Sequence, residues 1–365
     1  MRNDHADTRI ASFMKSSNPV FATRGDDLGT VAWSFVVLIG LYIDGWAHIN
    51  TNRSETFFTS WHIILYGGLF GCIGWMLRIC ARNSRAGHVG IDMIPRAYGA
   101  GILGILIFSA AGLSDMIWHT VFGVEASIGA LYSPPHLALL FGAFLIVTSP
   151  FRSAWCNPDW DLNPDSRAFD PIALSVVAAL GMISFIEQHL WTLGSPFHSA
   201  FRFARVHDVG RAYLVLVSLS SILLVSITLT SLVLIVCTRW NPPLGTFAFI
   251  LGLNTGMMVG MKAEGAWEQV AVAVIGGGVA DLLVRRLQPA CGTRPRAKRL
   301  IGAVFPLALW GTHFIAIGLV TSNPLQIEET VGITVTCSLA GLMLATMMTL
   351  PGPIPNEAAT GGAPE

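Results

Sequence analysis

Aspartate and histidine recur in one pattern in the N-terminal part of the chain. Asp44 and His48 are four residues apart, and so are Asp115 and His119. Residues at this spacing share one face of a helix. An aspartate and a histidine on one face can bind one metal ion, or the carboxylate can orient an imidazole that binds it. The spacing therefore predicts metal-binding chemistry.

A further histidine follows each pair. His62 ends the segment TSWH and His136 ends the segment SPPH, each at the start of the next apolar run. If that run is an antiparallel helix, its histidine returns to the depth of the preceding pair. The sequence thus predicts two sets of one carboxylate and two imidazoles. Such oxygen and nitrogen ligands suit copper, zinc, iron or manganese rather than magnesium or calcium.

Other acidic residues and histidines are candidates for additional ligands or for groups that orient the ligands. They are Glu55, Glu125, Glu187, His189, His198, Glu264 and His313. A single histidine near a membrane surface is more often only a polar residue. The repeated pattern favours a functional interpretation, because ionisable residues in apolar segments tend to face the bundle interior. Asp281, four residues before Arg285, instead predicts an ion pair.

The elements that must position these residues are apolar runs. Of the 365 residues, 53% are hydrophobic and 12% are charged, whereas soluble proteins average about 25% charged residues. A helix of about 20 apolar residues spans a bilayer, and the strict alternation of barrel strands does not occur. Transmembrane helices are predicted at 29–49, 57–80, 97–121, 135–150, 171–193, 212–238, 245–262, 269–288, 300–321 and 331–350.

The predicted fold is an all-α, polytopic membrane helix bundle of about ten transmembrane helices with duplicated helical hairpins. Residues SFIEQHLWTLG and SPFH resemble the repeated pattern and predict a third, worn copy. The units are a cytoplasmic N-terminal tail at 1–28, two repeated hairpins at 29–150, a third, degenerate hairpin at 151–238, four further transmembrane helices at 239–350 and a disordered tail at 351–365.

The distribution of Lys and Arg predicts the orientation. With the N-terminus inside, 17 of the 22 Lys and Arg residues lie in inner segments and 5 in outer segments, as the positive-inside rule requires. We expect a multi-pass protein of the cytoplasmic (inner) membrane with both termini in the cytoplasm. In this orientation both Asp/His sets lie at the outer ends of their helices.

Charge and cysteine content narrow the range of partners. The formal net charge is zero, which gives no reason to expect nucleic acid. The six cysteines form no CxxC pair, so neither a thiolate metal site nor a disulfide framework is expected. The lipid bilayer is the expected partner, and the sequence leaves the question of other protein partners open.

The hairpin pattern resembles the membrane component of the particulate methane and ammonia monooxygenases in which Asp-x-x-x-His on one helix and a histidine at the start of the next form a copper site. The resemblance implies copper at Asp44, His48 and His62, or at Asp115, His119 and His136. It covers one hairpin at a time, so substrate and activity are not carried over. Around DGWAH and FFTSWH the chain also resembles bacterial multi-pass membrane proteins that have no assigned function.

Four functions fit these residues. The first is a membrane oxidoreductase that uses copper or iron, with zinc as another candidate metal, on an apolar small molecule. The second is a proton- or metal-coupled transporter, because repeated hairpins with ionisable residues also build carriers. A haem or quinone protein and a zinc hydrolase follow. Clustering of the acidic residues and histidines on one side of the membrane favours the oxidoreductase.

Overall fold

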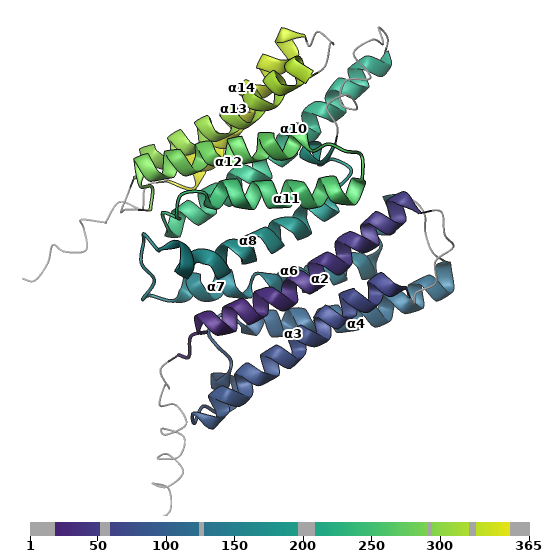
Figure 1. The fold of residues 1–365 in the computed structure, drawn as a ribbon, viewed down its shortest axis with the longest axis vertical. Coiled ribbons are helices and arrows are strands. Elements are labelled where there is room, and N and C mark those ends of the chain that lie inside the picture. The colour runs from purple at the N-terminus through teal and green to yellow at the C-terminus, as the bar shows by residue number, and fades with distance from the viewer. Residues whose placement is uncertain are drawn as a thin grey trace, which may run out of the picture.

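The structure is a computed structural model, and it describes residues 19–51, 59–123, 128–195, 209–290, 294–320 and 326–350. Within these ranges the chain forms helices joined by short connections, with no strand (Figure 1). The long helices are α2 (Arg24–Asn50), α3 (Ser60–Arg85), α4 (Gly99–Phe122), α6 (Pro134–Val147), α8 (Ser166–Ile186), α10 (Val209–Arg239), α11 (Thr246–Lys262), α12 (Glu268–Leu287), α13 (Pro295–Val320) and α14 (Ile327–Met347). Short helices are η1 (Gly90–Met93), α5 (Ile128–Leu131), α7 (Ser149–Cys156) and η2 (Thr192–Gly194).

Seven of the described helices are long and apolar enough to cross a membrane. The pair α6 and α7, bent by 43°, makes an eighth if it counts as one span. Helix α11 is shorter, at 17 residues, and α12 carries Asp281, Arg285 and Arg286 near one end. The chain is therefore a multi-pass membrane protein in contact with lipid, and the count of ten spans stays a prediction.

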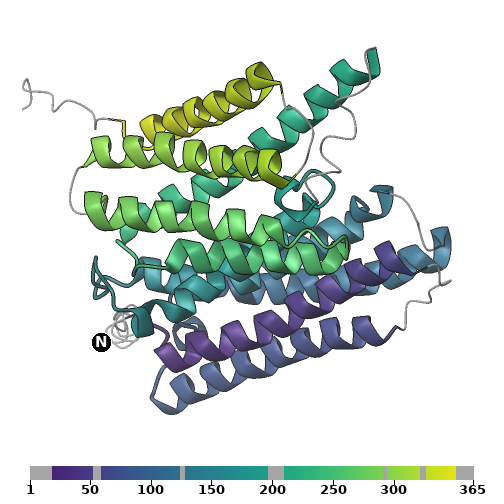
Figure 2. The same ribbon diagram turned by 45° about the horizontal axis from the view of Figure 1, so that its top comes forward.

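Two antiparallel hairpins, α2–α3 and α4–α6, form the N-terminal part of the bundle (Figures 1 and 2). Glycines allow the paired helices to approach closely. A Cβ atom on Gly68 of α3 would lie 2.6 Å from the backbone nitrogen of Val37 in α2. A Cβ atom on Gly142 of α6 would lie 2.8 Å from the backbone nitrogen of Phe108 in α4. Both hairpins thus bring their two helices into backbone contact at these glycines.

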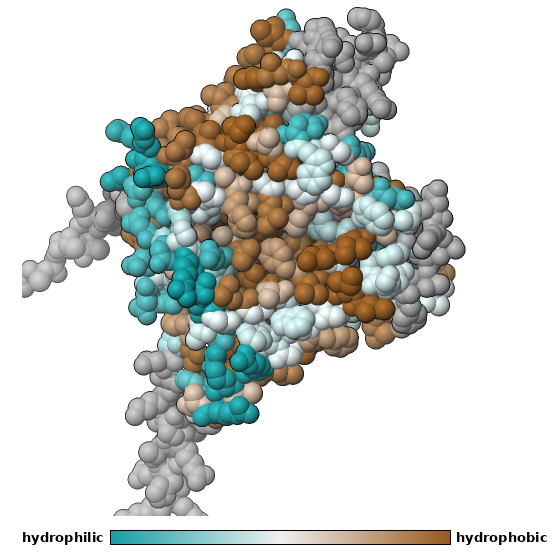
Figure 3. Space-filling view, in the orientation of Figure 1, coloured by the Kyte–Doolittle hydropathy of each residue, from teal (hydrophilic) through white to brown (hydrophobic). Residues whose placement is uncertain are grey.

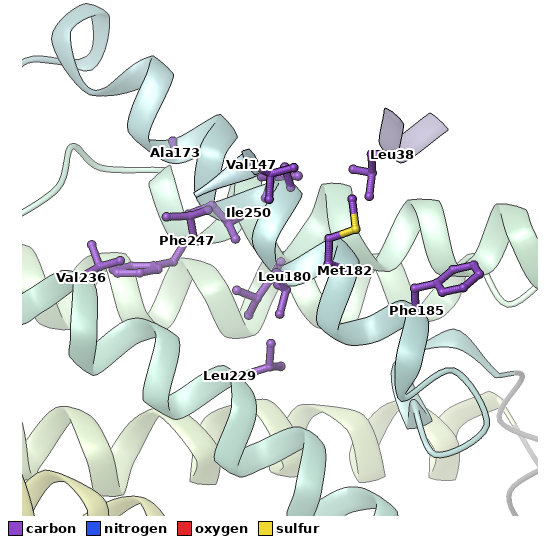
Figure 4. Packing of buried hydrophobic residues seen from close by; sticks show 14 of the residues in the cluster. Leu38, Val147, Ala173, Leu180, Met182, Phe185, Leu229, Val236, Phe247 and Ile250 are labelled. Carbon is purple, nitrogen blue, oxygen red and sulfur yellow. The ribbon is translucent and has the colours of Figure 1, made fainter. Parts of the chain in front are cut away.

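Helix α8 links the two hairpins to the C-terminal helices. It packs against α2, α6 and α7, and also against α11, and it is the most buried of the candidate spans. Figure 4 shows the core at this junction, where Leu180 and Met182 of α8 lie among Leu38, Leu229 and Ile250 from three other helices. Helices α11 to α14 then follow in order, each packed against the next (Figures 1 and 2).

Charged side chains close the end of the bundle at which α2 begins. Arg82 of α3 donates to both carboxylate oxygens of Asp26, at 2.6 and 2.8 Å, and the Tyr98 hydroxyl donates to Asp27 at 2.6 Å. These bonds join α2 to α3 and to the start of α4. Hydrophilic side chains gather along this edge, and a hydrophobic belt covers the middle of the molecule (Figure 3).

Asp281 has a different role from the predicted ion pair. Its two carboxylate oxygens accept hydrogen bonds from the backbone N–H groups of Phe247 and Ala248, at 3.0 and 3.1 Å. The free N–H groups at the start of a helix need such acceptors. The structure gives Asp281 no ion pair with Arg285, and Asp281 instead caps α11 from the neighbouring helix α12.

Candidate metal centre

One predicted ligand set converges between the end of α4 and the start of α6. Oδ1 of Asp115 lies 3.4 Å from Nε2 of His119 and 3.2 Å from Nε2 of His136. Ligand atoms from these three residues all lie within 4.8 Å of one another. Among the His, Cys, Asp and Glu residues that the structure describes, no other group of three meets this condition. The set offers two nitrogens and one oxygen to a single point.

The protonation of His119 leaves this point short of positive charge. Nδ1 of His119 lies 3.4 Å from the carbonyl oxygen of Gly123. A carbonyl only accepts, so Nδ1 carries the proton and Nε2 of the neutral ring presents its lone pair to Asp115. Oδ1 of Asp115 is buried and accepts no hydrogen bond from the described residues. A cation between these atoms would satisfy both.

The second predicted set lies between the end of α2 and the start of α3. Oδ1 of Asp44 is 3.6 Å from Nε2 of His48 and 3.5 Å from Nε2 of His62, and it too accepts no hydrogen bond from the described residues. This set is more open, because its ligand atoms do not all come within 4.8 Å of one another. The His48 side chain is 43% exposed, against 13% for His119.

Local sequence explains why the histidines of α3 and α6 reach the carboxylates. Thr59 precedes α3, and its side chain accepts a hydrogen bond from the backbone N–H of His62 at 3.3 Å. Ser133 precedes α6 and accepts from the backbone N–H of His136 at 3.4 Å. Each histidine is therefore the third residue of a capped helix. Its ring then faces the aspartate near the end of the preceding helix.

The two ligand sets lie close together. Asp44 interacts electrostatically with Asp115 and with His136 as well as with its own histidines. Helix α2 also packs against α6, and α3 against α4. Both sets therefore belong to one end of a four-helix arrangement, and this end is opposite the one closed by Asp26 and Arg82.

Several predicted residues lie elsewhere in the structure. Glu187 and His189 follow the end of α8, where burial raises the pKa of Glu187 to about 7. Burial and the charge of Lys262 lower the pKa of His189. Glu264 is exposed in the connection from α11 to α12. The structure does not bring these residues into a ligand group. Glu55, Glu125 and His198 lie outside the described residues.

His313 belongs to a separate chain of hydrogen bonds. It is 1% exposed in α13, and its Nδ1 lies 3.1 Å from Oε1 of Gln269. Nε2 of Gln269 donates to the carbonyl oxygen of Ser195 at 2.8 Å, and Nζ of Lys262 donates to the hydroxyl of Ser195 at 3.0 Å. These polar contacts join η2, α11, α12 and α13, which gives His313 a structural role.

Sequence reasoning did not identify Tyr66 or the environment of two tryptophans. Tyr66 of α3 interacts electrostatically with both Asp44 and Asp115. The indole nitrogens of Trp61 and Trp118, each one residue before a ligand histidine, are buried and have no hydrogen-bond acceptor among the described residues. The only signal in the sequence was helical spacing, since Tyr66 follows His62 by four residues.

Comparisons of the chain with protein-family models, with curated proteins and with solved structures give no match. The functional argument therefore depends on the donor atoms at the ligand sets. Two imidazole nitrogens and one carboxylate oxygen suit a transition metal, and the bare Oδ1 of Asp115 fits a ligand atom better than a structural carboxylate. The residues present fit a metal ion.

Proposed function

We propose that this protein is an integral membrane metalloprotein that acts as a metal-dependent oxidoreductase, with copper the favoured metal and iron the next. The observation that carries this proposal is Asp115. Its Oδ1 is buried, accepts no hydrogen bond from the described residues and faces His119 and His136 at 3.4 and 3.2 Å. A buried carboxylate without donors is unfavourable unless a cation binds there.

The neighbouring residues support redox chemistry on an apolar molecule. A bound copper or iron ion would supply one-electron redox chemistry. Asp115 would balance the charge of the ion, and the carbonyl of Gly123 holds His119 with Nε2 available. Trp61 and Trp118 place buried aromatic surface beside the ligands, which limits water. An apolar substrate can reach this end of the bundle through lipid.

The two hairpins are copies in this proposal, and each holds one metal ion at the outer membrane face. Equivalent positions support duplication. Gly68 approaches Val37 as Gly142 approaches Phe108. The same side-chain atoms, Oδ1 of aspartate and Nε2 of histidine, meet in both sets. The resemblance to the copper-binding membrane component of the methane and ammonia monooxygenases adds copper as the metal. The Asp115 set should bind more tightly, because its ligand atoms already converge.

Metal analysis tests the proposal. The full-length protein is purified in detergent through a tag without histidine, and bound copper, iron and zinc are measured per chain. We expect His119→Ala to lose the tightest metal equivalent and His48→Ala to keep it. His88→Ala is the matched control, because His88 follows α3 at the opposite end of the bundle. It should leave metal content unchanged.

The result that would refute the metal proposal is also defined. Folded wild-type protein that holds no metal after purification, and binds no added Cu²⁺, Fe²⁺ or Zn²⁺, would exclude a metalloprotein. Metal that remains in both His119→Ala and His48→Ala would place the site elsewhere. Metal bound without any redox change under oxidants and reductants would remove the oxidoreductase and keep the metal site.

A metal-coupled transporter is the second candidate, and a buried polar group favours it. The Tyr42 hydroxyl lies 3.0 Å from that of Ser184, and Nδ2 of Asn254 donates to Ser184 at 2.8 Å. Tyr42 is two residues before Asp44, so these groups extend polarity from one ligand set into the bundle. Copper or zinc uptake by proteoliposomes would support this function, and metal that stays bound without transport would exclude it.

A further inference from the structure

Tyr66 lies at the junction of the two hairpins. It is one helical turn after His62 on the same face of α3, and the two rings meet at 6.2 Å in an edge arrangement. On its other side, the ring meets Phe108 of α4 at 6.1 Å, again edge to face. The phenol ring is thus held between a ligand histidine of one hairpin and the core of the other.

A glycine in α4 makes room for the phenol hydroxyl. A Cβ atom on Gly112 would lie 2.9 Å from the Tyr66 hydroxyl oxygen and 2.8 Å from Cε1. Gly112 is buried, and it precedes Asp115 by three residues. Residues three apart are neighbours on a helix surface. The hydroxyl therefore lies against α4 about one turn from Asp115.

The carboxylates of both ligand sets act on this phenol. Tyr66 interacts electrostatically with Asp115 and with Asp44, and the two carboxylates interact with each other. An ionised carboxylate only accepts hydrogen bonds, whereas a phenol donates one. Tyr66 is the group whose position suits donation toward either carboxylate.

We infer that Tyr66 is a positioning residue shared by both metal sets, and that its hydroxyl orients the carboxylates of Asp44 and Asp115 when metal is bound. This inference rests on the proposed function. Groups that hydrogen-bond to metal ligands fix their orientation, and their removal weakens metal binding by about 10- to 100-fold. A shared phenol also explains how one hairpin can sense the metal in the other.

Two variants remove the hydroxyl from its place by different routes. Tyr66→Phe deletes the oxygen and keeps the ring. Gly112→Ala keeps the oxygen but fills its space, and the phenol must move because its far end is the group in contact. Tyr42→Phe is the matched control. It deletes another buried hydroxyl, one that contacts Ser184 and the carbonyl oxygen of Gly181 instead of the ligand sets.

The measurement is Cu²⁺ binding to the full-length protein in detergent, in competition with a chromophoric chelator, together with the Cu²⁺ electron paramagnetic resonance spectrum. We expect Tyr66→Phe and Gly112→Ala to weaken binding at both sets by about 10- to 100-fold and to change the spectrum. Tyr42→Phe should match the wild type in both. The spectrum separates a change at the ligands from a general loss of stability.

Each outcome has a definite meaning. Cu²⁺ affinity and a spectrum equal to the wild type in Tyr66→Phe would overturn the inference and leave the proposed metal function intact. Weakening at only one set would overturn the shared role. A wild-type protein that binds no Cu²⁺ would refute the proposed function, and the inference with it.

Discussion

Replacing Asp115 by asparagine should stabilise the metal-free protein while it abolishes metal binding. In the metal-free wild type, the carboxylate faces the lone pair of His119 and accepts no hydrogen bond from the described residues. The asparagine amide is neutral, and its Nδ2–H can donate to Nε2 of His119. Asp115→Asn therefore removes an unfavourable buried charge and adds a hydrogen bond in the same space.

The expected magnitude follows from burial. The side chain of Asp115 is 3% exposed, and a buried polar group without partners costs about 1–3 kcal/mol. The midpoint of thermal unfolding shifts by about 2–4 °C per kcal/mol in chains somewhat shorter than this one. Metal-free Asp115→Asn should thus unfold about 2–6 °C above the metal-free wild type at about pH 8. The wild type should gain about 2.7 kcal/mol when free metal is about 100 times the Kd, and the variant should gain nothing at that site.

Thermal unfolding in detergent measures both effects. Intrinsic fluorescence is suitable because the chain has 11 tryptophans, and each protein is scanned with chelator and with added Cu²⁺. Asp26→Asn is the matched control. Asp26 is also a buried helical carboxylate, but it accepts from Arg82 at 2.6 and 2.8 Å. Neutralising it should lower the unfolding temperature, because it breaks a satisfied ion pair.

Either of two results would refute the reasoning. Metal-free Asp115→Asn that unfolds below the metal-free wild type would mean that the carboxylate is satisfied without a cation. A metal-induced shift that survives in the variant would mean that Asp115 is not a ligand. Repeating the scan at about pH 5, where imidazoles take up protons, should reduce the advantage of the variant, because an imidazolium donates to the wild-type carboxylate.

Two further predictions concern packing and pH. Gly68→Ala should destabilise the α2–α3 hairpin by about 1–3 kcal/mol, because its Cβ would lie 2.6 Å from the backbone nitrogen of Val37. Gly67→Ala, which meets nothing within 4 Å, should be neutral or stabilising by up to about 1 kcal/mol in the same thermal scan. Burial raises the pKa of Glu187 from 4.5 to about 7, so its contribution to stability is fully present below pH 4.5 and is lost as pH rises through 7. Glu187→Gln should make unfolding temperature less dependent on pH between these values, and an unchanged dependence would show that Glu187 is not the group responsible.

The arrangement of the ligand residues followed from short-range rules. Asp115 and His119 share a helix face because they are four residues apart, and His136 returns to the same depth because SPPH starts a helix. These relations need only helical geometry and a turn. The existence of the apolar helices was equally predictable, because runs of about 20 apolar residues are long enough to span lipid.

Tertiary contacts decided what the spacing could not. The two ligand sets have the same pattern, yet only the Asp115 set converges among the described residues, and that depends on how closely α4 and α6 approach. Asp281 has Arg285 at helical spacing but accepts from Phe247 and Ala248, because α12 packs against the start of α11. A partner from another helix overrides a partner on the same helix when backbone N–H groups need acceptors.

The buried carboxylates of the two ends of the bundle differ in one respect that bears on function. Where α2 begins, Asp26 accepts from Arg82 and Asp27 accepts from Tyr98. At the opposite end, Oδ1 of Asp44 and of Asp115 accepts no hydrogen bond from the described residues. One fold thus satisfies its structural carboxylates and leaves two others bare, each facing imidazole nitrogens. Residues that break a local rule without compensation within the chain are expected at functional sites, and a cation is the group that would compensate both.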